Sequence, residues 1–268
     1  MLSYISLDLR LRRRALLGWS LVMFLFIVIT VWSWGAGEGE ELQKIYEELF
    51  RQFPEDFIKL FGKGVPETLS LEAYYVINYF VLVHIVLLGA YSAYAGAGAV
   101  VDDLLERTGP LYLSLPISRR RLLLSRFVSI MVIVGGASLS SLIITHLTSL
   151  FFGTEELMGR NILLLHLHSL PYLALCVSVG MLLGTVLPAA LVKPVAAGLV
   201  VLDYAVDTMS LGTSLESLGY LTASRYYPAL EVAVKGTVSA VDVTVLTLLC
   251  VIALFLAITI YEEKDMPV

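Results

Sequence analysis

Charged residues are scarce in this sequence. Asp, Glu, Lys and Arg together make up 15% of its 268 residues, whereas a typical soluble domain carries about 25%. Hydrophobic residues make up 58%, and the mean hydropathy is +0.83. This composition excludes an ordinary water-soluble globular protein. It favours a protein with several membrane-spanning helices, each of which needs about 20 mostly apolar residues.

Cysteine and histidine are also rare, with two and four residues respectively. Cys176 and Cys250 each lie inside an apolar run, so a disulfide framework or a zinc cluster has no support, and we interpret both as small buried hydrophobic residues. His166 and His168 are two residues apart and point to different faces of a helix. We interpret them as interfacial residues rather than as metal ligands, and the sequence predicts no metal site.

Motifs of bond-breaking chemistry are missing. Gly62–Gly64 lacks the spacing and the hydroxyl of a phosphate-binding loop. Gly212–Glu216 fails at the last position of a G-x-S-x-G elbow, and the sequence has no H-E-x-x-H pair. We therefore predict that the chain is not an enzyme and binds no cofactor itself. Any energy for transport must come from a gradient or from another polypeptide.

Long apolar runs are what the sequence does contain. They predict an all-α polytopic membrane protein, a single transmembrane domain over residues 1–268 with about six spans. The expected spans are Ala15–Trp34, Glu72–Val101, Leu122–Phe152, Ile162–Leu187 (kinked at Pro171), Pro194–Leu211 and Val241–Tyr261. We expect Pro188–Pro194 to form a tight turn, and Met1–Arg14 to form a separate basic amphipathic helix on the inner leaflet.

Arginine and lysine near the spans predict the orientation. Short segments rich in these residues face the cytoplasm, which places both termini there, in a plasma-membrane protein. The inner cations are Arg10, Arg12–Arg14, Arg107, Arg119–Arg121, Arg126, Lys193 and Lys264. The acidic Gly35–Leu71 is then external. Gly212–Ala240 is too polar to span; it either dips into the membrane and returns or lies on the outer surface.

Several polar residues fall inside the expected spans, where they are costly and often functional. His84 and Tyr91 share a helix face, and Ser141 and Thr145 belong to a hydroxyl stripe on the next span. We take these four and Asp203 as candidates for a substrate path. The alternatives are hydrogen bonds to neighbouring helices and, for Asp203, a span that ends early and leaves the carboxylate near water.

The most charged stretch is Val101–Phe127, which separates the second and third spans. It opens with an acidic cluster and closes with a basic one. Between them lies a short amphipathic piece, Pro110–Leu115, stopped by Pro116. A short rigid helix with charge at both ends is suited to contact a soluble cytoplasmic partner.

Within this stretch, Leu113–Arg119 (LSLPISR), preceded by Glu106 and followed by Leu122–Arg126, resembles the signature of type-2 ABC transporter permeases. The usual Gly-Thr-Leu-Glu is replaced here by Arg107–Pro110. The resemblance implies a permease, mostly of exporters, that pairs with a second permease subunit as a homo- or heterodimer and docks on a separate cytoplasmic ATPase, which binds ATP and magnesium. It also implies a coupling helix that contacts the ATPase. We assign that contact to Glu106, Arg107, Thr108, Leu111, Tyr112 and Leu115.

A second hypothesis stays open. The chain would then be a secondary transporter or channel that works without ATP. Its acids Asp203 and Asp242 and its histidines His84 and His146 would relay ions through the membrane.

Overall fold

The structure is a computed structural model that describes residues 2–36, 44–45, 48, 70–105, 118–211 and 213–263. Within these ranges it contains helices and no strand, and six helices are long and apolar enough to cross a membrane. The all-α polytopic fold is therefore confirmed. The long elements are α1 (Leu2–Ala36), α5 (Leu88–Leu105), α7 (Arg119–Phe152), α8 (Arg160–Val186), α9 (Ala189–Ser210) and α12 (Ala240–Glu263). The short ones are α4 (Leu71–Tyr75), the π-helix η2 (Val76–Leu87), η3 (Glu155–Met158), α10 (Glu216–Gly219), η4 (Ser224–Tyr226) and α11 (Ala229–Lys235).

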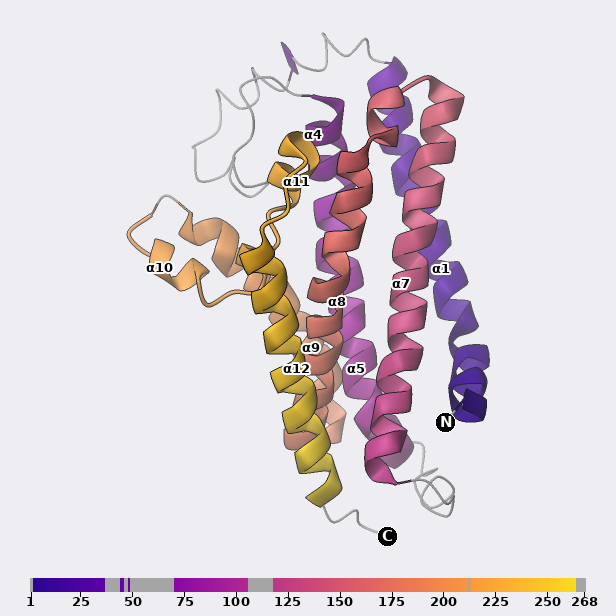
Figure 1. Ribbon diagram of the computed structural model, residues 1–268, viewed down its shortest axis with the longest axis vertical. Helices are drawn as coiled ribbons and strands as arrows, with labels where there is room; N and C mark the ends of the chain where they lie inside the picture. Colours follow the sequence, from indigo (N-terminus) through magenta and orange to yellow (C-terminus); the bar gives the residue numbers. More distant parts are fainter. Residues whose placement is uncertain are drawn as a thin grey trace.

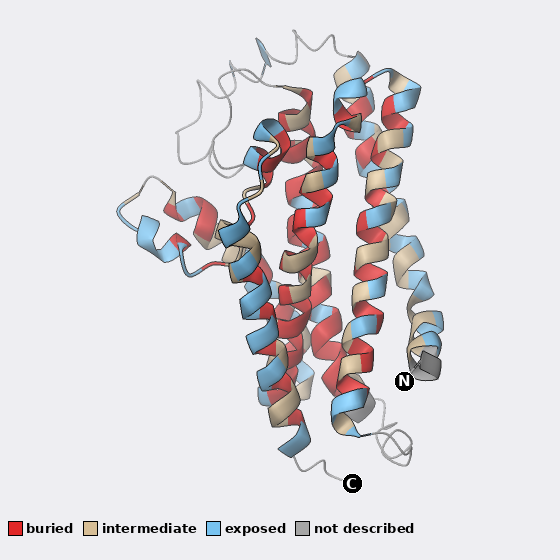
Figure 2. Cartoon of the chain, in the orientation of Figure 1, coloured by how far each residue is buried: buried red, intermediate tan, exposed pale blue. Residues whose placement is uncertain are grey.

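The long helices run side by side in one elongated bundle, and both ends of the chain lie at the same end of it (Figure 1). Helix α8 is central and packs against α5, α9 and α12, while α1 pairs with α7 at one edge. Burial follows this arrangement, because α5 and α8 are largely buried whereas α1 and α12 expose most of their surface (Figure 2). The exposed faces are apolar, as expected for helices that contact lipid.

Glycines allow α5 and α8 to approach closely. A Cβ atom on Gly180 would collide with the carbonyl oxygen of Ala93, and one on Gly96 would collide with the carbonyl oxygen of Val177. A Cβ atom on Gly184 would collide with the side chain of Val100. Small residues at such spacing are a common means of packing membrane helices backbone to backbone.

The second span is one continuous helical run from α4 through η2 to α5. The π-helical part is 12 residues long, and its wider turn shifts which side chains share a face. Tyr75 and Tyr79 lie in the first turns of this span. Both rings are fully buried, and their hydroxyls contact α7 inside the bundle.

The two ends of α7 have local causes. The hydroxyl of Ser118 accepts a hydrogen bond from the Arg121 backbone N–H, so this N-cap starts the helix three residues before the expected Leu122. At the other end Gly153 adopts the left-handed conformation, with φ of 70°, which terminates the helix at little cost because glycine lacks a Cβ atom.

Two expected boundaries were wrong. No break separates Met1–Arg14 from the first span, because α1 is a single helix and the sequence around Arg14 contains neither proline nor a capping residue. The interfacial position of its first turns stays a prediction. The fifth span begins at Ala189 rather than at Pro194, which lies inside α9. The turn is therefore confined to Leu187 and Pro188, and Pro194 removes one helical hydrogen bond, which membrane helices tolerate.

Residues 213–239 fold back onto the bundle as α10, η4 and α11. Helix α11 packs on α8, α4 and η2, whereas α10 packs on α9 and projects to one side (Figure 1). Tyr227 is buried, and its hydroxyl donates to the carbonyl oxygen of Leu165 in α8. This segment is thus anchored in the protein core at Tyr227.

Candidate functional site

A set of buried polar side chains lies where η2, α7 and α8 meet. We call it the polar cluster: Tyr75, Tyr79, His84, Ser138, Ser141, Thr145, His166 and Ser169. Each is at most 3% exposed. Polar groups are expensive inside a membrane protein unless they bond to one another. The hydrogen bonds of this cluster therefore determine what it can do.

Two tyrosine–hydroxyl pairs connect the second span to the third. The Tyr75 hydroxyl lies 2.8 Å from Thr145 Oγ1, and the Tyr79 hydroxyl lies 2.6 Å from Ser141 Oγ. Both pairs are four residues apart on antiparallel helices, so they form successive steps of one ladder. The ladder fixes the register of η2 against α7.

His166 gives this network a direction. Its Nδ1 lies 2.8 Å from the Ile162 carbonyl oxygen, so in a neutral ring Nδ1 carries the proton and donates. Its Nε2 is then an acceptor, and the Ser141 hydroxyl at 3.0 Å donates to it. Ser141 in turn accepts from the Tyr79 hydroxyl. The Tyr79 hydroxyl therefore donates to Ser141, and the Ser141 hydroxyl donates to His166.

His84 occupies the other side of the cluster. Its Nε2 lies 3.1 Å from Ser169 Oγ and 3.3 Å from Ser138 Oγ. The Ser169 hydroxyl donates to the His166 carbonyl oxygen, so we assign the Nε2–H of His84 as the donor to Ser169. The ring of Phe80 stacks on His84 with centroids 4.3 Å apart, which shields the imidazole from the surrounding helices.

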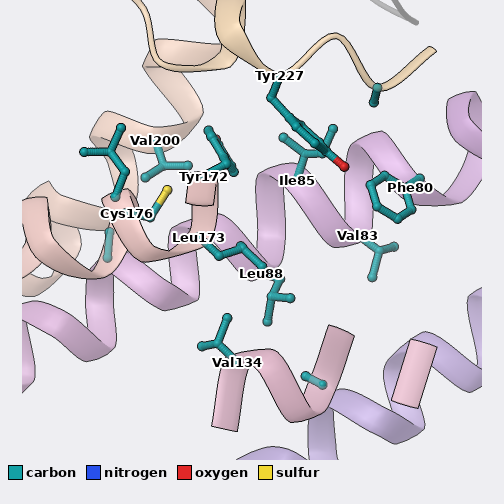
Figure 3. Close-up of a cluster of buried hydrophobic side chains, with 14 of the residues drawn as sticks. Phe80, Val83, Ile85, Leu88, Val134, Tyr172, Leu173, Cys176, Val200 and Tyr227 are labelled. Carbon is teal, nitrogen blue, oxygen red and sulfur yellow. The ribbon is translucent and has the colours of Figure 1, made fainter. Parts of the chain in front are cut away.

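Tyr227 closes this region from the folded-back segment. Its ring stacks on Tyr172 with centroids 5.8 Å apart, and the edge of His168 lies against it at 4.9 Å. Figure 3 shows Tyr227 reaching toward Phe80 and Ile85, with Tyr172 beside it. Burial raises the pKa of the Tyr227 hydroxyl well above its ordinary value, so this group stays neutral and serves as a donor.

The chemistry open to the cluster is limited by its burial. Among the described residues, no group of three or more His, Cys, Asp or Glu side chains could hold a metal ion. The cluster's groups bond chiefly to one another, so in this conformation they hold three helices together. Each interhelical hydrogen bond in a membrane protein contributes about 0.6 kcal/mol on average.

The predicted substrate-path residues fall into three places. His84, Ser141 and Thr145 belong to the polar cluster. Tyr91 is half-buried and packs against Trp19 of α1, with ring centroids 5.4 Å apart. Asp203 lies on α9, where its carboxylate accepts hydrogen bonds from the backbone N–H groups of residues 223 and 224. The structure therefore brings three of the five together and separates the other two.

The residues of the ion-relay hypothesis are also dispersed. His146 is partly buried, and its Nδ1 bonds to the Leu142 carbonyl oxygen of its own helix. Asp242 is partly buried in the first turn of α12. Neither of these two residues belongs to the polar cluster. His84, another residue of the ion-relay hypothesis, does belong to it.

Sequence reasoning missed Tyr75, Tyr79, His166 and Ser169. The interpretation of His166 and His168 as interfacial was wrong, since both are 3% exposed. One signal was present in the sequence: Tyr75 and Tyr79 have the same four-residue spacing as Ser141 and Thr145 on the following span. Such matched spacing on consecutive antiparallel helices predicts a ladder of side-chain contacts.

A second polar region lies at the end of the bundle where both termini are found. Lys193 Nζ of α9 lies 2.7 Å from Asp102 Oδ1 of α5 and 4.7 Å from the ring centroid of Tyr94. Arg126 of α7 is buried and donates to the Ala99 carbonyl oxygen of α5. These contacts fix the ends of α5 and α7, between which residues 106–117 run. The predicted ATPase contacts at Glu106, Arg107, Thr108, Leu111, Tyr112 and Leu115 lie outside the described residues.

The comparison with protein families decides the class of this bundle. The family model described as ABC-2 family transporter protein matches residues 5–266. The chain belongs to the ABC-2 transporter family. The resemblance to type-2 ABC permeases is thereby confirmed over almost the whole chain. No curated protein and no solved structure gave a match to this permease.

Family membership gives the two polar regions their context. The polar cluster lies inside the transmembrane bundle of an ABC permease, and the Asp102–Lys193 pair lies beside the segment that carries the family signature. An ABC-2 family permease is a membrane subunit and is not itself catalytic. The geometry of both regions agrees with binding and mechanical roles.

Proposed function

We propose that this chain is the permease subunit of an ABC exporter, driven by ATP that a separate cytoplasmic ATPase hydrolyses. The observation that carries the proposal is the family match over residues 5–266, together with six helices able to span a membrane. The ATPase supplies the ATP and magnesium sites. The working unit contains two permease subunits, and we propose a homodimer.

The proposed ATPase contact is Glu106–Leu115. In sequence this segment connects the end of α5 to the start of α7, and those two helix ends lie at the same end of the bundle as the start of α1 and the end of α12. The positive-inside pattern supports a cytoplasmic position for that end. Glu106 and Arg107 select the partner by complementary charge, and Leu111, Tyr112 and Leu115 supply its apolar contacts.

The contacts around this segment support its role in coupling. Asp102 of α5 holds Lys193 of α9, and Arg119 at the start of α7 donates to the Glu262 carbonyl oxygen at the end of α12, at 3.3 Å. A displacement of Glu106–Leu115 by the ATPase therefore reaches α9 and α12 through direct side-chain contacts. This is the step by which nucleotide binding changes the arrangement of the spans.

Copurification tests this proposal. The tagged full-length chain should bring down a stoichiometric ATPase from native membranes, and the complex should hydrolyse ATP. Replacement of residues 106–115 by a Gly/Ser linker should abolish both the association and the hydrolysis. Vigorous transport by the chain alone in liposomes, driven by an ion gradient without ATP, would overturn the proposal in favour of a secondary transporter.

Point variants test whether the ATPase contacts this segment. Glu106→Lys and Leu115→Asp should leave the fold intact, because neither residue lies in a span, while hydrolysis no longer drives transport. Glu231→Lys is the matched control, since Glu231 is exposed and pairs only with Lys235 on its own helix in the part of the chain that the structure describes. Normal ATP-driven transport by both loop variants would show that the ATPase does not bind this segment.

A further inference from the structure

An apolar cavity of about 380 Å³ lies between α8, α9 and the turn that precedes η4. Its walls include Leu175 and Val179 of α8, Ala196 and Val206 of α9, and Leu221 of the turn. It is separate from the polar cluster, since His84, Ser141 and His166 do not line it. The question is which ligand its shape and chemistry would accept.

The cavity is a groove that follows α9. Its lining extends from Ala196 to Val206, which corresponds to about 15 Å at the rise of an α-helix. This length matches the hydrocarbon depth of one leaflet, half of about 30 Å. Leu202 and Leu221 on the rim are 55% and 84% exposed, so the groove opens sideways, toward the lipid that surrounds a membrane-spanning helix. A single acyl chain suits these dimensions.

A carboxylate lines the groove near one end. Asp203 is part of the cavity wall, and its two carboxylate oxygens accept hydrogen bonds from the backbone N–H groups of Ala223 at 2.7 Å and Ser224 at 3.0 Å. These two bonds fix the position of the carboxylate beside the groove. Asp203 forms no ion pair with any described residue, whereas Arg225 is shared between Asp207 and Glu216.

We propose that this groove binds one acyl chain of a membrane phospholipid that carries a primary amine in its headgroup. The chain lies along α9 on the Ala196 side of Asp203, and the ammonium group pairs with Asp203. Charge selects the headgroup: Asp203 is the one Asp, Glu, Lys or Arg residue among the described residues that line the groove, so a cationic group is attracted and an anionic headgroup is repelled.

Photolabelling tests the site on the full-length chain, without any ATPase. The purified protein is placed in phosphatidylcholine vesicles that contain a trace of phosphatidylethanolamine with a diazirine in its acyl chain. Matched probes carry the same chain with a phosphatidylcholine or a phosphatidylglycerol headgroup. We expect adducts on residues 172–179 and 196–206. The ethanolamine probe should label about 10-fold more than the choline probe, the ratio that one charge-assisted hydrogen bond supplies.

Variants separate the headgroup from the chain. Asp203→Asn should bring the ethanolamine-to-choline ratio close to 1 while the chain still labels the groove. Val206→Trp should fill the groove and remove the labelling. Val201→Trp is the matched control, because Val201 lies on the same helix, is 46% exposed and does not line the cavity. Should Val206→Trp fail to fold, Val179→Phe fills the groove from α8.

Three results would overturn the proposal. Equal labelling by all three headgroups would remove the selection by Asp203. Labelling spread evenly over the exposed face of α9, Val201 included, would show general lipid contact and no site. Cross-links from the groove to a second copy of the chain would show that a protein surface covers it. Since no transport is measured, failure of the proposed function leaves this test unaffected.

Discussion

Replacement of Ser141 by alanine tests whether the hydrogen bonds of the polar cluster hold the helices together. Ser141 accepts from the Tyr79 hydroxyl at 2.6 Å and donates to His166 Nε2 at 3.0 Å. Ser141→Ala therefore leaves two buried groups without a partner. Interhelical hydrogen bonds in membrane proteins average about 0.6 kcal/mol and reach about 1.7 kcal/mol, so the expected loss is about 1–3 kcal/mol of unfolding free energy.

Two further variants make the test specific. Tyr79→Phe removes one of the two bonds and leaves Ser141 free to donate to His166, so it should cost about half as much. The double variant should cost less than the sum of the single ones, because no Tyr79 hydroxyl remains to lose its acceptor. Ser129→Ala is the control on the same helix: Ser129 is fully buried, and its hydroxyl donates to the Ser125 carbonyl oxygen of its own helix.

The assay is equilibrium unfolding of the purified full-length chain in mixed micelles, titrated with dodecyl sulfate and followed by circular dichroism. The predicted order of destabilisation is Ser141→Ala, then Tyr79→Phe, then Ser129→Ala near zero. If Ser141→Ala is no worse than Ser129→Ala, the cluster does not hold the helices together. If Tyr79→Phe costs more than Ser141→Ala, Ser141 is not the group that joins Tyr79 to His166.

Three other predictions concern packing, charge and the folded-back segment. Gly180→Val should abolish monodisperse protein in size-exclusion chromatography, because its side chain would enter the α5 backbone, whereas Gly198→Val, which meets nothing within 4 Å, should not. Asp102→Lys should lower the free energy of unfolding by roughly 0–1 kcal/mol, the contribution of a partly exposed ion pair, and should lower the melting temperature slightly. The double variant with Lys193→Asp should regain the melting temperature of the parent. If it does not, the pair contributes nothing to stability. Tyr227→Phe should cost about 1 kcal/mol in the same unfolding assay, and since burial raises the Tyr227 pKa, the variant should titrate spectroscopically like the parent while exposed tyrosines ionise.

The spans were predictable because the membrane imposes one strong constraint. A helix in lipid must be apolar over about 20 residues, and each of the six runs appears in the sequence without reference to the others. Local signals refine the ends: Ser118 caps α7, and Gly153 terminates it. Pro194 misled the prediction, because a proline that breaks a soluble helix is accepted inside a membrane helix.

The candidate site was less predictable because hydropathy does not report which helices are neighbours. His166 looked interfacial from its place near the end of a run, yet α7 and η2 bury it. The 12-residue π-helix changes the face that Tyr79 presents, and periodicity at 3.6 residues per turn cannot reveal this. Asp203 finds its partners at Ala223 and Ser224, which follow it only after a reversal of the chain.

The distribution of polar contacts distinguishes α9 from the other spans. Side-chain hydrogen bonds tie η2, α7 and α8 together through the polar cluster. Helix α9 instead packs through apolar residues, with Val192, Ala196 and Val200 spaced four apart and buried on one face. Its charged contacts lie toward its two ends, at Lys193 and at Asp203.

This arrangement indicates which contact would transmit a movement of α5 to α9. Lys193 joins the start of α9 to Asp102, three residues before α5 ends and residues 106–117 begin. Apolar contacts have no preferred direction, so they resist sliding less than a ladder of hydrogen bonds does. Within the proposed function, a movement of residues 106–117 would therefore shift α9 against the bonded set of η2, α7 and α8. The groove along α9 lies on the surface that such a shift would widen or close.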